Sequence, residues 1–330
     1  MVDAALSEDI LVSSRSSALR RFGRSDLRFR ALTGAAALLV VVIFAGLIAT
    51  LVVGAWPAIK AFGFDFLVMS FWNPVTERFG AFPAIYGTVV SSAIAMLIAF
   101  PIGIGIAIFL TELCPRSLKR PIGIAIELLA GIPSIVYGIW GLFVFAPYFQ
   151  QTLQPWMVDA FANVPILSSL FAGPPFGVGI FTASLILSIM ILPFISAVTR
   201  DVFETVPHTL KEAAYAIGCT TREVMWNVVL PYSRAGVVGG AMLALGRALG
   251  ETMAVTFVIG NAHHISGSLF SPGTTISATI ASEFTEALGT LYIPALIELG
   301  LVLFGITFIV LAIAQLMLYR LNRLAGGGSK

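Results

Sequence analysis

Residues Thr205 to Pro231 read TVPHTLKEAAYAIGCTTREVMWNVVLP, and this pattern predicts two helices joined by a tight turn. In the first half, apolar residues recur at i, i+3, i+4 and i+7, which places them in one stripe along a helix. The stripe consists of Leu210, Ala213, Ala214 and Ile217. Pro207 is typical of a first helical turn, and Gly218 is typical of a helix end. Thr220 and Glu223 have the spacing of a capping box, which predicts that a second, short helix begins there. We call Thr205–Pro231 the elbow.

On both sides of the elbow the chain carries very few charges. Its 330 residues include 19 Lys and Arg and 17 Asp and Glu, or 11% charged residues, where a soluble globular protein has about 25%. So few charges cannot cover a soluble domain, and a net charge of +2 excludes the basic patch that a nucleic-acid-binding protein needs. Uncharged runs long enough to cross a bilayer predict an all-α integral membrane protein with six transmembrane helices. Their approximate ranges are 32–56, 84–110, 121–148, 177–199, 235–260 and 292–319.

The distribution of Lys and Arg predicts the orientation of these helices. Sixteen of the 19 lie in the N-terminal tail, in the connections after the second and fourth helices, and at the C-terminus. By the positive-inside rule these segments, both termini included, are cytoplasmic, which also keeps Cys114 and Cys219 reduced. The first helix is too long for a cleaved signal peptide and is expected to remain as an anchor. The expected parts of the chain are a basic cytoplasmic tail at 1–30, a six-helix domain at 31–320 and a cytoplasmic tail at 321–330.

The elbow is therefore expected on the cytoplasmic side, where two interpretations compete. One is a helix that lies in the lipid headgroups. Its polar face has little positive charge, however, because Lys211 is offset by Glu212 and Glu204. The other is a helix that docks in a groove of another protein. Short alanine side chains favour docking because they allow a partner to approach closely.

The elbow also resembles the EAA loop of the permeases of ABC importers. Glu212-Ala213-Ala214, then Gly218, then Leu230-Pro231 have the spacing of that loop, and Val228 stands where the pattern has an apolar residue. The resemblance implies a type I importer permease with a MetI-like core over about residues 85–319. It also implies that the loop at 205–231 docks in a cleft of an ATP-hydrolysing subunit. The residues to which it assigns this coupling are Leu210, Glu212, Ala213, Ala214, Gly218, Leu230 and Pro231.

The predicted helix at 235–260 has two charges near its middle. Arg247 lies 13 residues from both Arg234 and Gly260, which is roughly 20 Å from either end at 1.5 Å per residue. A charge at that depth costs about 2.5–3.5 kcal/mol on insertion scales. Glu251, four residues on, lies on the same face of an unbroken helix and can pair with Arg247. The pair is either a structural contact or, as we favour, the lining of a water-filled path in which the guanidinium binds an oxyanion bidentately.

Three further segments narrow the resemblance. Leu128–Pro147, GRALGETMAVTFVIGNA at residues 246–262, and Ser271–Ala287 resemble the PstC-type permeases of bacterial phosphate importers. The resemblance implies a multi-pass protein of the bacterial inner membrane that imports inorganic phosphate. It implies as partners a PstA-like sister permease, a pair of PstB-like ATP-binding subunits and a PstS-like extracytoplasmic phosphate-binding protein. ATP and Mg²⁺ belong to the ATP-binding subunits, and no cofactor is expected on this chain.

The sequence predicts no catalytic site. It has no Walker A sequence, no nucleophile–base arrangement and no cluster with metal-ligand spacing, so we expect a transport subunit and not an enzyme. Three alternatives stay open. The first is a permease for another oxyanion, such as sulfate or molybdate. The second is a proton-coupled secondary transporter with Glu127 and Glu251 as a relay, and the third is a membrane scaffold that transports nothing.

We also state expectations for five more positions. Glu127 faces either the path or a neighbouring helix. His263 and His264 are expected in a solvated outer loop, because no further metal ligands accompany them. Glu283 and Glu286 are expected on an outer helix that faces a binding protein.

Overall fold

The computed structural model describes the backbone of residues 2–326 and the side chains of residues 29–320. Within this part of the chain every named element is a helix, and extended residues pair only in an isolated bridge between Asn73 and Arg78. This confirms the predicted all-α class. The chain divides into two units, Met1–Gly54 and Ala55–Lys330, which are described separately.

The first unit is the larger part of one long helix, α1 (Val2–Phe62). Its segment Phe29–Phe62 is long enough to cross a membrane, and its most apolar window has a mean hydropathy of 3.0. This confirms the first predicted transmembrane helix, although the helix extends beyond the range 32–56. Most side chains of the predicted tail at 1–30, and all those of the tail at 321–330, lie outside the described residues.

The second unit holds four more helices that are long and apolar enough to cross a membrane. They are α3 (Phe82–Ile108) with its π-helical extension η1 (Phe109–Leu113), α9 (Ile180–Glu204), the continuous helix of α11 (Thr221–Val224), η4 (Met225–Val229) and α12 (Leu230–Leu249), and α15 (Tyr292–Gly326). One further span results if α4 (Arg116–Ala130) and the helix Ser134–Phe161 count as a single crossing bent by 87°. The described part of the chain thus has five or six candidate spans, in agreement with the prediction of six.

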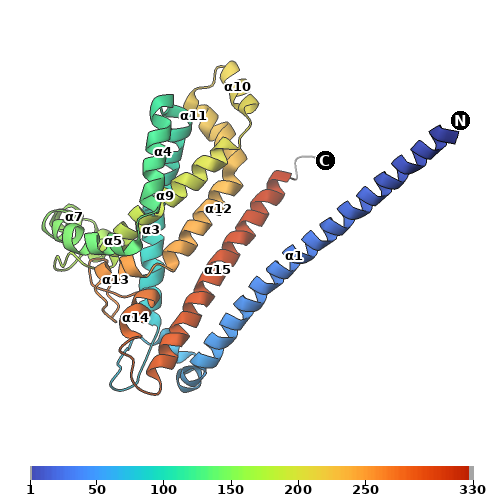
Figure 1. The fold of residues 1–330 in the computed structure, drawn as a ribbon. Coiled ribbons are helices and arrows are strands. Elements are labelled where there is room, and N and C mark those ends of the chain that lie inside the picture. Colours follow the sequence, from blue (N-terminus) through green and yellow to red (C-terminus); the bar gives the residue numbers. More distant parts are fainter. Residues whose placement is uncertain (1, 327–330) are drawn as a thin grey trace. The chain divides into compact units, whose positions relative to one another are not determined.

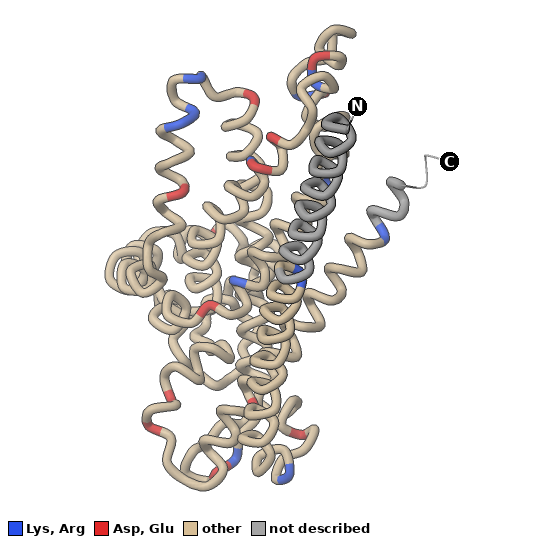
Figure 2. The backbone as a smooth tube through the Cα atoms, turned by 45° about the vertical axis from the view of Figure 1, so that its right-hand side comes forward, with Lys and Arg blue, Asp and Glu red and all other residues tan. Residues whose placement is uncertain are grey.

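Short helices connect these spans. Those within Ser134–Phe161 are α5 (Ser134–Trp140), η2 (Gly141–Phe145), α6 (Ala146–Tyr148), η3 (Phe149–Leu153) and α7 (Gln154–Phe161). The others are α2 (Asp65–Val68), α8 (Pro165–Leu170), α10 (His208–Ala216), α13 (Met253–Ile259) and α14 (Ile276–Glu283). Within the second unit, α10 and α14 lie at opposite ends of the bundle (Figure 1), which we call the α10 end and the α14 end. Most charged residues of this unit lie towards its two ends (Figure 2), as expected for helices that cross a membrane.

Two predicted helices are broken in the structure. The helix expected at 121–148 ends at Ala130 and resumes at Ser134, because Pro133 lacks a backbone N–H and disfavours helical geometry at the residue before it. The helix expected at 235–260 begins earlier, at Thr221, and ends at Leu249. Gly250 follows as its C-cap, and α13 starts as a separate helix at Met253. The prediction of one continuous helix was therefore wrong in both places.

The core of the second unit is built around α9. This helix packs most extensively on α3 and also contacts α12, α13 and α4. Close approach depends on glycine: a Cβ on Gly236 or Gly240 of α12 would lie 2.6 or 2.7 Å from a methyl group of Val202 or Val198. These two glycines are spaced by four residues, as in the small-residue contacts of membrane helices. The fixed α9–α12 contact positions the elbow, which joins these two helices.

Candidate functional site

The elbow has the turn that the sequence predicts. α10 ends at Ala216, and Gly218 adopts the left-handed conformation with φ of +91°. The Gly218 N–H donates to the carbonyl of Tyr215 (3.0 Å), and the Cys219 N–H donates to the carbonyl of Ala214 (3.1 Å). These two bonds form a Schellman motif, which satisfies carbonyls at the end of α10. The role of Gly218 as a helix end is confirmed.

The predicted capping box is also present. The Thr220 N–H donates to Glu223 Oε2 (2.8 Å), and Thr220 Oγ1 accepts from the Glu223 N–H (3.4 Å). The helix that begins here is not short, however, because the π-helical stretch η4 joins α11 to α12 without a break. Leu230 and Pro231 therefore lie within one long helix. Leu230 packs against the buried cluster that contains Ala214, so the fold brings together two parts of the EAA pattern that are far apart in sequence.

The predicted apolar stripe of α10 is divided between two environments. Ala214 is buried against a cluster that includes Phe203 and Val229. Ala213 and Glu212 are exposed, and Ile217 is 82% exposed. Large apolar side chains that stay exposed in a folded segment can mark an interaction surface. We call the exposed group the elbow surface; its members are Leu210, Tyr215, Ile217 and Trp226.

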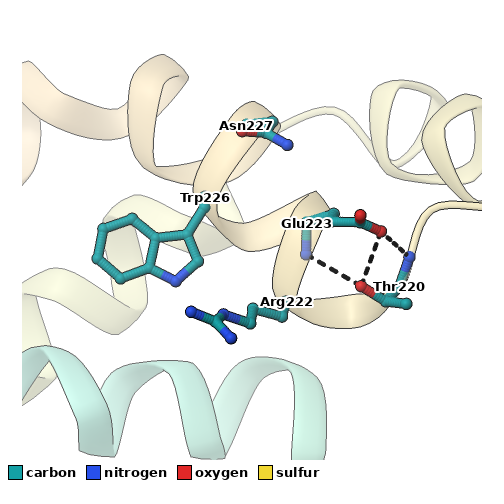
Figure 3. A pocket seen from close by; sticks show the side chains of 5 residues that line it. All are labelled: Thr220, Arg222, Glu223, Trp226 and Asn227. Carbon is teal, nitrogen blue, oxygen red and sulfur yellow. Dashed lines mark hydrogen bonds between the residues drawn. The ribbon is translucent and has the colours of Figure 1, made fainter.

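A hollow opens beside the elbow surface at the start of α11. Thr220, Arg222, Glu223, Trp226 and Asn227 line it (Figure 3). The capping box fixes Thr220 and Glu223, while Arg222 and Trp226 lie together on another side of the helix (Figure 3). The hollow therefore offers an aromatic ring and a guanidinium, the two side-chain types most often found at the centres of protein interfaces.

At the α10 end of the bundle, ion pairs join neighbouring helices. Lys211 of α10 bonds to Glu112 of η1 (2.6 Å), and Lys119 of α4 bonds to Glu204 of α9 (3.0 Å). Glu127 of α4 bonds to Arg200 of α9 (2.8 Å). Of the two expectations for Glu127, the structure therefore favours contact with a neighbouring helix.

Arg247 and Glu251 lie on opposite sides of the break between α12 and α13. Arg247 is exposed in the last turn of α12, and Glu251 Oε1 accepts a hydrogen bond from the N–H of Ala254 in the first turn of α13 (3.3 Å). Among the side chains of residues 29–320, none forms an ion pair or hydrogen bond with Arg247. The prediction of a pair on one helix face was wrong, because the helix does not continue past Leu249. Each charge instead complements a helix end, with the cation at a C-terminus and the carboxylate at an N-terminus.

A polar cluster at the α14 end was not predicted. Glu283 accepts hydrogen bonds from Trp72 Nε1 (2.7 Å) and the Tyr292 hydroxyl (2.8 Å), and its other oxygen bonds to His263 Nε2 (2.6 Å). The His263 ring stacks on Trp72 with centroids 5.2 Å apart. The expectation of a solvated His263 was wrong, since both side chains of the His263–Glu283 pair are 19% exposed. Glu283 likewise does not lie on an open helix face. Glu286 is exposed, but it lies in the turn after α14 and not on a helix as expected.

The cluster changes the acidity of Glu283. Burial alone raises the pKa of its carboxyl group, but hydrogen bonds from His263, Tyr292 and Trp72 outweigh burial and hold the pKa below its ordinary value. The partners of Glu283 come from separate parts of the chain, so no local sequence pattern signals the cluster. In the described residues, no group of three His, Cys, Asp or Glu side chains is arranged to hold a metal ion.

Comparison with known sequences gives one family and a consistent set of relatives. The profile of the family "Binding-protein-dependent transport system inner membrane component" matches residues 99–323. The chain is 64% identical to "Phosphate transport system permease protein PstC" of Mesorhizobium japonicum, over 95% of this chain and 96% of the relative. It is 56% identical to the protein of the same name in Pasteurella multocida, over 91% of this chain and 94% of the relative.

Solved structures with the same fold are also transporter subunits. A chain of a bacterial alginate ABC transporter, solved in complex with an alginate-bound periplasmic protein, has a TM-score of 0.60 at 18% identity and covers 90% of this chain and 96% of its own. A chain of the MetNI methionine ABC transporter in an inward-facing conformation has a TM-score of 0.50 at 15% identity, over 73% and 94%. At such low identity these similarities concern the fold, and they agree with the predicted MetI-like core.

Proposed function

The chain belongs to the family of binding-protein-dependent transport system inner membrane components, and we propose that it is the permease subunit of an ATP-driven importer of inorganic phosphate. The observation that carries the proposal is the 64% identity, over 95% of the chain, to a protein named as a phosphate transport permease. The bundle of apolar helices agrees with a multi-pass membrane subunit, in which ATP hydrolysis belongs to a partner.

The elbow supplies the contact with that partner. Its turn is fixed by Gly218 and by the capping box, while the elbow surface remains open. A helix with small residues and a few exposed anchors fits a groove of a protein better than a lipid surface. We therefore assign the docking of an ATP-binding subunit, which holds ATP and Mg²⁺, to the EAA residues. They are Leu210, Glu212, Ala213, Ala214, Gly218, Leu230 and Pro231.

The break between α12 and α13 supplies the site for the anion. Transporters often place substrate sites where a membrane helix is interrupted. Arg247 is exposed there and is without a partner among the described side chains, so its guanidinium is available for a tetrahedral oxyanion. Glu251 can accept a hydrogen bond from a protonated oxygen of the same anion. A single Arg opposed by a Glu gives weak binding, which suits a path that must release its cargo.

The assembly and its orientation complete the proposal. The partners are a PstA-like sister permease, a pair of PstB-like ATP-binding subunits and a PstS-like phosphate-binding protein. The chain lies in the bacterial inner membrane with both termini cytoplasmic, since the excess of Lys and Arg lies in those segments. The α10 end then faces the ATP-binding subunits, and the α14 end faces the binding protein.

Uptake by the reconstituted importer tests the proposed function. The complete complex in vesicles, with ATP and Mg²⁺ on the ATPase side and the binding protein on the other, is expected to accumulate radiolabelled phosphate. Unlabelled sulfate or molybdate in excess is expected to leave this uptake unchanged. Uptake without ATP that follows a proton gradient would contradict the proposal, and competition by sulfate or molybdate would assign the chain to another oxyanion.

A further inference from the structure

The ion pair between Lys211 and Glu112 is the most enclosed of those formed by the described side chains. Their side chains are only 11% and 12% exposed, and the Nζ–Oε1 distance is 2.6 Å. By comparison, the Lys119–Glu204 pair at the same end of the bundle has side chains 41% and 49% exposed. Removing one partner of a buried pair leaves the other charge unpaired in a poorly solvated site. Lys211 and Glu112 are therefore strongly constrained to remain together.

This pair is one of few attachments that α10 has to the rest of the bundle. Ala214 is the one buried residue of α10. A cavity beside the pair, lined by Thr111, Lys119, Glu204, His208 and Lys211, leaves the first turn of α10 without close packing on that side. The polar attachment of α10 on this side therefore runs through Lys211.

The partner helix leads to the opposite end of the molecule. Glu112 lies in η1, which continues α3 without interruption, and α3 extends to the α14 end. There, a Cβ on Gly87 would overlap the carbonyl oxygen of Thr274, and Thr88 Oγ1 accepts a hydrogen bond from the N–H of Ile276 (2.9 Å). Helix α3 thus connects, through its extension η1, to the ion pair with α10 at one end and packs closely on the start of α14 at the other.

We propose that the Lys211–Glu112 ion pair is a tether that makes α10 and α3 move as one body, and that α3 transmits ATPase-driven movement to the segment before α14. Glu112 is then a positioning residue that acts through Lys211, and neither side chain contacts phosphate. The inference rests on the proposed function, because a partner ATPase must drive α10.

The ratio of phosphate imported to ATP hydrolysed tests the tether in the complete importer. Glu112→Gln is expected to lower this ratio about tenfold, within the range of typical coupling free energies. The ATPase should still co-purify, since the elbow surface is unchanged. The reversed pair E112K/K211E is expected to restore most of the ratio, because it keeps the attraction with the charges exchanged. Lys119→Gln is the matched control, because it breaks the exposed pair at the same cavity and should leave the ratio unchanged.

A distance measurement tests the same inference without altering the pair. Spin labels at the exposed positions Leu97 of α3 and Thr209 of α10, with Cys114 and Cys219 replaced by serine, report the separation of the two helices through the ATPase cycle. The separation is expected to change by less than about 3 Å, which is near the size of ordinary helix shifts. A larger change would overturn the tether.

Other outcomes distinguish failure of the tether from failure of the proposed function. A normal ratio in Glu112→Gln, or an equal loss in Lys119→Gln, refutes the tether while the importer itself works. Failure of E112K/K211E to recover more than Glu112→Gln also counts against the tether. If the unmodified complex shows no ATP-dependent phosphate uptake, the proposed function fails first.

Discussion

Replacing Gly218 by alanine isolates the contribution of the turn in the elbow. Gly218 has φ of +91°, and no atom lies within 4 Å of the position that a Cβ would take. An alanine there meets no neighbour, so its cost is the left-handed backbone conformation alone. That cost is about 1–2 kcal/mol for an L-residue. A free energy of this size corresponds to roughly a 5- to 30-fold shift in an equilibrium, here away from the closed turn.

Two other variants distinguish the backbone strain in Gly218→Ala from the general effect of replacing a glycine by a less flexible residue. Gly239 also has no atom within 4 Å of its Cβ position, but it lies inside α12 with ordinary helical geometry. Gly239→Ala is therefore expected to be neutral or to stabilise the helix by about 0.5–1 kcal/mol. Gly218→Asn should fall between glycine and alanine, because asparagine visits the left-handed region more readily than other L-residues.

Hydrogen exchange and ATPase activity together measure the effect. Amides of residues 208–220 should exchange about 5- to 30-fold faster in Gly218→Ala, since the turn opens more often. Stimulation of the partner ATPase by the binding protein should fall in parallel. The reasoning would be refuted by unchanged exchange in Gly218→Ala, or by equal losses in the Gly239→Ala control.

Three further predictions concern single side chains. Arg247→Gln should lower phosphate uptake about 10- to 100-fold, because it removes a charge-assisted hydrogen bond to the anion. The complex should still assemble, and normal uptake would exclude Arg247 from the path. Trp226→Ala should weaken ATPase binding by about 2 kcal/mol, as for an interface anchor. Helix content should not change, because Trp226 is 63% exposed. Undiminished co-purification of the ATPase would contradict this prediction. Because the pKa of Glu283 lies below its ordinary value of 4.5, its stabilising effect is present above that value and is lost as pH falls through the lowered pKa. Melting temperatures of Glu283→Gln should therefore lie below those of the unmodified chain at neutral pH and converge with them as the pH falls below the lowered pKa of Glu283. The exposed control Glu286→Gln should match the unmodified chain throughout.

The elbow was predictable because its determinants are local. A capping box requires two residues at fixed spacing, and a helix end requires one glycine that tolerates positive φ. Both features depend on backbone geometry within a few residues, so Thr220, Glu223 and Gly218 could be placed from sequence alone. The length of the following helix could not be predicted in this way. Apolar runs mark where a helix is able to cross a membrane, but they do not mark where an adjoining helix merges with it.

The broken helices escaped prediction for a related reason. Apolar residues continue on both sides of Gly131–Pro133 and of Gly250–Thr252, and yet the backbone changes direction or ends its helix at both places. Turn signals were present in the sequence, a proline at the first break and a glycine at the second. The assignment of Arg247 and Glu251 to one helix face followed from that missed break. The Glu283 cluster lay beyond sequence reasoning, because Trp72 is separated from Glu283 by 211 residues.

The unbroken helix Thr221–Leu249 has a mechanical consequence. It carries the docking region at one end and Arg247 near the other, 26 residues apart, or about 39 Å at 1.5 Å per residue. A rod of that length is a lever arm. If it tilts about its elbow end by only about 5°, its far end sweeps through roughly 3.4 Å, which exceeds the length of a hydrogen bond. A small rotation of this helix is therefore enough to carry the guanidinium into or out of reach of a bound anion.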